Sequence, residues 1–169
     1  MQKKNKEEAR KLKIQLVTRY GHLDPGRDGS EINETLIEQT RHWLDQFPEV
    51  LDLYNESLQK HNHGIFTRNV LDDLRLSLEK LLHSIFQNRK SLENQIQFIG
   101  PFIKQRGGSA ELSNMFLKLV DYYTKYQNTY IKHDSSVIEE EVEFVFEITS
   151  SFMKHFVRLN EKIKGKQSA

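Results

Sequence analysis

The residues most suited to chemistry lie in one short segment, YQNTYIKH, at positions 126–133. It brings together an amide, an ammonium group and an imidazole, on Asn128, Lys132 and His133. A lysine can stabilise phosphate charge, and a histidine can move a proton near neutral pH. These groups together suit a phosphodiester, and the neighbouring tyrosines could stack on bases.

The spacing within this segment decides which side chains can act together. In a helix, Asn128 and Lys132 are four residues apart and share a face. His133 is five residues from Asn128 and lies off that face, so it joins them only where the helix ends or tightens. A structural explanation is also open, because tyrosines at this spacing are typical of a helix core. A Lys-His pair before a turn also suits a helix C-terminus.

Two further groups of polar residues are candidates for a site. Arg68 with Asp72 and Arg75 with Glu79 have the spacing of helical ion pairs. They are either surface pairs or, as a charged row beside a broad apolar face, the mark of a buried pair or a functional groove. His61 and His63 offer two metal ligands, but no third ligand is near them in sequence, so we expect solvated turn histidines and no metal.

The elements that position these residues are predicted to be helices almost throughout. Apolar residues recur at helical spacing, as at Leu74, Leu78, Leu81 and Leu82, and no strand pattern of useful length occurs. Ser30 and Ser109 are expected N-caps, Pro48 a helix start, and Gly100-Pro101 a kink or break. The sequence therefore predicts an all-α protein, an antiparallel helical bundle with short connections.

Length and composition suit one such domain. With 169 residues, we expect an amphipathic helix and a Gly/Pro/Asp linker over 1–29, the helical domain over 30–165 and a disordered tail over 166–169. Twenty-five Lys and Arg against 24 Asp and Glu leave a net charge of +1, which disfavours nucleic-acid binding through overall charge but not through a local patch.

Several classes of protein are excluded or disfavoured. Cysteine is absent, which excludes a disulfide framework, a thiolate zinc site and a cysteine nucleophile, and fits a reducing cytoplasm. The longest apolar run is only a few residues, so no membrane association is expected. No Gly-rich phosphate loop, Gly-x-Ser-x-Gly elbow or His-Glu-x-x-His motif occurs, and no cofactor is expected.

Three stretches taken together resemble the abortive-infection-type branch of the HEPN superfamily of helical nucleotide-binding domains. They are RNVLDDLRLSLEKLLHSIFQNRKSLENQ (68–95), YQNTYIKH (126–133) and EEEVEFVFEITSSFMKHFVRL (139–159). The similarity spans roughly residues 47–159. It implies a HEPN-like bundle that forms a homodimer. Many domains of this superfamily are metal-independent ribonucleases of phage-defence, toxin–antitoxin or RNA-processing systems.

The site of the family consists of an Arg, a polar residue after it and a nearby His, paired across the dimer. By this resemblance His133 matches the His and Asn128 the polar residue, but Gln127 stands where the Arg is expected. A glutamine is neutral and cannot offset phosphorane charge as an arginine would. Lys125, Lys132 or Arg75 could supply the missing cation.

Two functions follow from these observations. In the first, the chain is a defence or stress protein acting on RNA as an endoribonuclease. Its catalytic set would be His133, Asn128, Gln127 and Lys132, and its RNA contacts Lys125, Tyr126 and Arg75. In the second, it is a non-catalytic helical subunit that binds RNA or a protein partner from the same defence system. Gln127 and the near-neutral charge favour this alternative.

Overall fold

The computed structural model describes residues 8, 11–12, 32–64, 67–133 and 138–167, without the side chains of 67–68, 127–133 and 163–167. The elements are α2 (Glu34–Leu44), α3 (Pro48–Asn62), α4 (Thr67–Phe86), the 3₁₀ turn η2 (Leu92–Gln95), α5 (Ile96–Gln105), α6 (Ala110–His133) and α7 (Glu139–Gln167). Within these ranges no strand occurs, which confirms the all-α prediction. No helix in them is both long enough and apolar enough to cross a bilayer.

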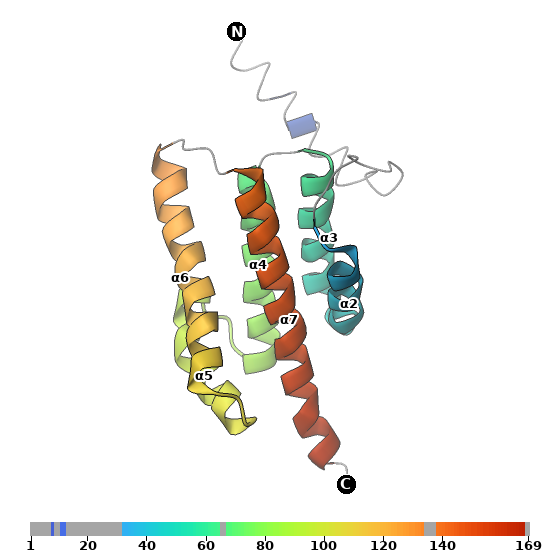
Figure 1. Cartoon of the computed structure of the whole chain (residues 1–169), viewed down its shortest axis with the longest axis vertical. Coiled ribbons are helices and arrows are strands. Elements are labelled where there is room, and N and C mark those ends of the chain that lie inside the picture. The colour runs from blue at the N-terminus through green and yellow to red at the C-terminus, as the bar shows by residue number, and fades with distance from the viewer. Residues whose placement is uncertain (1–7, 9–10, 13–31, 65–66, 134–137, 168–169) are drawn as a thin grey trace.

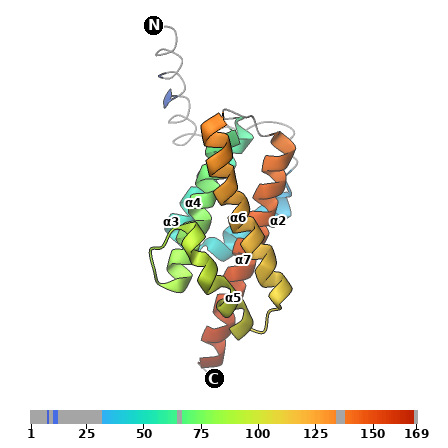
Figure 2. The same ribbon diagram turned by 90° about the vertical axis from the view of Figure 1, so that its left-hand side faces the viewer.

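The four longest helices run along the long axis of the molecule (Figure 1). Successive members α3, α4, α6 and α7 alternate in direction, so the ends of α3 and α6 and the starts of α4 and α7 all lie at one end. Helix α3 packs on α4, and α7 packs on both α2 and α4. The turned view shows α5 packed along the lower part of α6 (Figure 2).

The helix starts follow local capping chemistry. Helix α2 is capped by Asn33, whose side chain accepts a hydrogen bond from the backbone N–H of Leu36 at 2.9 Å. The expected cap, Ser30, lies outside the described residues. A cap at position 30 would start the helix at residue 31, whereas α2 begins at Glu34. Ser109 caps α6 as predicted, accepting from Leu112 N–H at 3.1 Å, and Pro48 is the first residue of α3.

Helix α5 continues through Pro101, where the sequence predicted a kink or break. Pro101 is the sixth of the ten residues of α5, so the helix continues although the proline lacks the N–H that would bond the carbonyl of Gln97. The interruption lies earlier, at the 3₁₀ turn Leu92–Gln95. The helix ends in a Schellman motif, in which Gly107 N–H bonds Lys104 O and Gly108 N–H bonds Ile103 O.

Buried hydroxyl pairs and stacked aromatic rings join the helices. The Tyr54 and Ser150 hydroxyl oxygens are 2.6 Å apart and join α3 to α7. Phe116 of α6 stacks on Phe152 of α7 with ring centroids 3.9 Å apart. These contacts join α7 to both α3 and α6.

Candidate functional site

The segment predicted to act on RNA lies at the C-terminal end of α6, which continues as a helix through His133. Positions 128 and 132 therefore share a helical face, as expected. Position 133 lies about 140° around the helix axis from position 128, at 3.6 residues per turn. The side chains of Gln127, Asn128, Lys132 and His133 lie outside the described residues, so their roles stay predictions.

The tyrosines before this segment belong to the core and to the α6–α7 contact. Tyr123 is fully buried and Tyr126 is 3% exposed, so neither ring offers a free face to a base. This burial corrects the expectation that Tyr126 stacks on RNA. Tyr122 is partly buried and donates a hydrogen bond to Glu141 of α7 at 2.9 Å. Burial and the adjacent carboxylate raise the pKa of Tyr122 far above its usual value, so it stays a neutral donor.

The two basic residues expected to contact RNA differ in their surroundings. Lys125 is 74% exposed and pairs with Asp121 at 2.7 Å, an exposed pair that is easily broken. Arg75 is 16% exposed, and its Nη2 lies 3.5 Å from Glu79 and 3.4 Å from Glu93. Lys125 is therefore accessible to a phosphate, whereas Arg75 is already neutralised.

Arg75 belongs to a structural network that holds η2 on α4. Glu79 is 14% exposed and also accepts the backbone N–H of Leu92 at 2.8 Å. The pair of Arg75 and Glu79 is partly buried, so it is not one of the solvated surface pairs. The corresponding pair of Arg68 with Asp72 lies outside the described residues, because the Arg68 side chain is not described.

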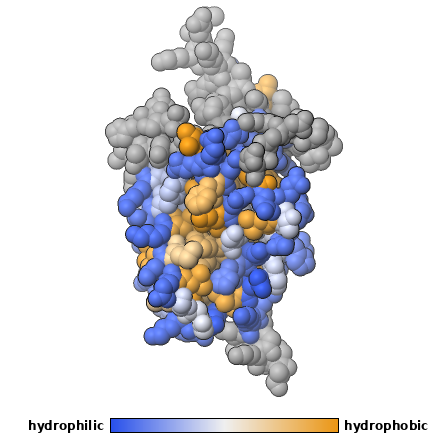
Figure 3. Space-filling view, viewed as in Figure 1, coloured by the Kyte–Doolittle hydropathy of each residue, from blue (hydrophilic) through white to orange (hydrophobic). Residues whose placement is uncertain are grey.

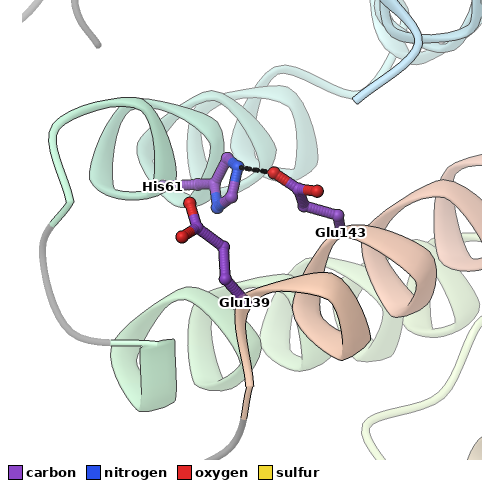
Figure 4. Close-up of side chains that lie close together, drawn as sticks. All are labelled: His61, Glu139 and Glu143. Atoms are coloured by element: carbon purple, nitrogen blue, oxygen red, sulfur yellow. Dashed lines mark ion pairs between the residues drawn. The ribbon is translucent and has the colours of Figure 1, made fainter. Parts of the chain in front are cut away.

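A second group of polar side chains meets where α3 ends and α7 begins (Figure 4). His61, in the last turn of α3, places its Nε2 3.2 Å from Glu143 Oε1. Glu139, the first residue of α7, completes the group, and one ligand atom from each of the three lies within 4.8 Å of the others. We refer to these three residues as the His61 cluster.

The burial of His61 and Glu143 was not anticipated. His61 is 7% exposed and Glu143 is 8% exposed, so the expectation of a solvated turn histidine is wrong for His61. His63 does follow the helix, as its C-cap residue, but it is also partly buried, with Nδ1 2.7 Å from Gln59 O. Glu139 and Glu143 have a recognisable four-residue spacing, but nothing in the sequence links them to a histidine in another helix.

A third feature is an apolar groove of about 470 Å³ between α6 and α7. Its lining residues are Met115, Lys118, Leu119, Tyr122, Glu141, Phe144, Val145, Ile148 and Phe152. Met115 is 56% exposed and Phe144 is 61% exposed. In the space-filling view hydrophobic side chains gather between hydrophilic borders on this face (Figure 3). We call this feature the α6–α7 groove.

Helical periodicity predicts apolar faces along α6 and α7, but it does not show which part of each face a neighbouring helix leaves uncovered. The groove arises because each helix has an apolar arc wider than the part its neighbours cover. Phe144 is an example, since it lies between buried residues in the sequence and yet is exposed. Comparison of the chain with protein-family models, with curated proteins and with solved structures finds no match.

Proposed function

We propose that this chain is a HEPN-like helical module that pairs with a second copy and acts on RNA at the C-terminal end of α6. The observation that carries the proposal is the α6–α7 groove, because α6 bears both the groove and segment 127–133. Contiguous exposed apolar surface of this kind is typical of macromolecular interfaces. Pairing through the groove would fix the two copies of the segment relative to one another.

The borders of the groove favour a second copy as its occupant. Lys118 on α6 carries a positive charge and Glu141 on α7 a negative charge. Two copies related by a two-fold axis can therefore pair without placing a row of like charges against itself. Met115 and Phe144 supply large exposed side chains that such a pairing would cover. These features support a homodimer, which the family resemblance also implies.

The proposed reaction is attack of a ribose 2′-hydroxyl on the adjacent phosphate, with no metal in the step. The hydroxyl oxygen bonds to phosphorus, its proton passes to a base, and the 5′-oxygen leaves after accepting a proton. His133 would serve as the acid or base and Asn128 would orient the phosphate. Lys132 would stabilise the developing charge, and the exposed Lys125 would hold the flanking RNA.

The test is cleavage of a structured RNA by the purified full chain in excess chelator. The parent is compared with His133→Ala and with His42→Ala, a matched control because His42 is exposed on α2. We expect the parent and the control to cleave alike, and His133→Ala to be slower by about 10²–10⁴-fold, the usual contribution of a general acid or base. Equal cleavage by His133→Ala would refute the catalytic assignment.

A second candidate is a non-catalytic helical subunit that binds a partner protein. Gln127, which stands where the resemblance predicts an arginine, favours it. The groove would then receive an apolar helix of another protein. Absence of cleavage by the parent, together with a monomeric parent in solution, would support this candidate over the ribonuclease.

A further inference from the structure

We propose that His61, Glu139 and Glu143 form a binding site for a divalent transition-metal ion of the zinc class. The His61 cluster joins the last turn of α3 to the first turn of α7 (Figure 4). A bound ion would bridge these helices at the end of the molecule where α6 also ends. The site is independent of the proposed RNA chemistry, which uses no metal.

The ligand types select the class of ion. One imidazole nitrogen and two carboxylate oxygens suit zinc and its neighbours, whereas magnesium and calcium prefer oxygen ligands alone. Soft ions such as copper(I) favour thiolates, and the chain has no cysteine. Three protein ligands leave a fourth position of a tetrahedral ion for a water molecule or an anion oxygen.

The spacing of the ligand atoms also suits such an ion. Bonds of about 2.0–2.2 Å to nitrogen and oxygen place neighbouring ligand atoms of a tetrahedral site about 3.3–3.6 Å apart. His61 Nε2 and Glu143 Oε1 are 3.2 Å apart. Glu139 supplies a carboxylate oxygen within 4.8 Å of both.

The helical placement of the two carboxylates gives the site its rigidity. Glu139 and Glu143 are four residues apart on α7, a spacing that presents both side chains on one face. Like charges at this spacing destabilise a helix slightly, and a cation between them removes that cost. His61 is held in α3 and is 7% exposed, so its ring has little freedom to turn away.

The test is isothermal titration of zinc into the full chain after chelator treatment and desalting, with magnesium as a second probe. Glu139→Gln removes a ligand at a partly exposed position without changing side-chain shape. Glu140→Gln makes the same change at the next residue, which is exposed and outside the cluster. Glu143→Gln provides a second ligand variant, and circular dichroism without metal checks that each variant is folded.

We expect the parent and Glu140→Gln to bind zinc with the same affinity, and magnesium to give no comparable binding. Glu139→Gln and Glu143→Gln should bind zinc at least about tenfold more weakly, since even the loss of an outer-shell partner costs about 10–100-fold. Zinc should also raise the melting temperature of the parent and of Glu140→Gln more than that of Glu139→Gln and Glu143→Gln. Failure of the parent to bind zinc, or equal affinity in all four proteins, would overturn the proposal and leave the cluster as an ion pair.

Discussion

The hydroxyl oxygens of Tyr123 and Thr149 lie 2.7 Å apart and join α6 to α7 inside the protein. Both residues are fully buried, so water cannot replace this contact. Burial raises the pKa of Tyr123 well above its usual value, which keeps the phenol neutral. The pair therefore helps to fix α6, the helix that carries the candidate RNA-binding segment, against α7.

Removal of the Tyr123 hydroxyl should destabilise the protein. Tyr123→Phe keeps the ring but leaves the buried Thr149 hydroxyl without this partner, at a cost of about 1–3 kcal/mol in the free energy of unfolding. Urea denaturation followed by circular dichroism measures the change. Thr149→Val is the companion variant, and the double variant should lose less than the sum of the two single losses. Strictly additive losses would mean that the two hydroxyls do not interact.

The α6–α7 groove should control self-association. Met115→Glu places a charge on an exposed apolar position of the groove and should convert a dimer to a monomer in sedimentation velocity, since a buried unpaired charge is costly. Asn114→Glu adds the same charge at the adjacent exposed position of α6, outside the groove lining, and should leave the dimer intact. If the parent is monomeric at all accessible concentrations, a second copy of the chain does not occupy the α6–α7 groove.

Local features of the fold were predictable because they depend on residues close in sequence. The spacing of Leu74, Leu78 and Leu81 predicts a buried face of α4, and each is at most 2% exposed. Ser109 is also a cap readable from its neighbours. Such signals arise from helical periodicity and from unpaired backbone groups at helix ends.

Features that depend on contacts between distant helices were not predictable. His61 meets Glu143 only because α3 ends where α7 begins, and Arg75 meets Glu93 only because η2 folds back on α4. A single sequence contains the ligand types but not their distances. The same limit explains why Tyr126 could be assigned to RNA stacking when it is in the core.

Two glycines of the α5 region should respond differently to alanine. Gly100 lies inside α5, and an added Cβ meets nothing within 4 Å among the described residues apart from its chain neighbours. Pro101 follows it and disfavours helical backbone at a preceding residue that carries a Cβ, so Gly100→Ala should gain less than the stabilisation of about 1 kcal/mol usual for this change in a helix. Gly107 has φ +80°, so Gly107→Ala should destabilise the protein by about 1 kcal/mol or more. Thermal denaturation of both variants measures the effects, and an unchanged stability of Gly107→Ala would contradict the assignment of Gly107 as the left-handed residue of the Schellman motif.

His155 should make the protein less stable at mildly acidic pH. Its side chain packs beside Phe116, and its Nε2 is buried without a hydrogen-bond partner in the described part of the chain. Burial, reinforced by Arg158 and Lys162, lowers the pKa of His155 below its ordinary value of 6.5. The unfolded chain therefore binds the proton more tightly than the folded one. The free energy of unfolding should decrease as the pH falls through 6.5 toward the folded-state pKa.

The variant His155→Gln removes this titration and keeps a polar side chain. Its free energy of unfolding, measured in urea between pH 8 and pH 5, should fall less steeply with decreasing pH than that of the parent. The difference between the two slopes should correspond to the uptake of less than one proton on unfolding. His42→Gln, at an exposed position of α2, is the matched control and should follow the parent. Parallel curves for the parent and His155→Gln would show that another group causes the acid sensitivity, because a group changes the slope only when its pKa differs between the folded and unfolded states.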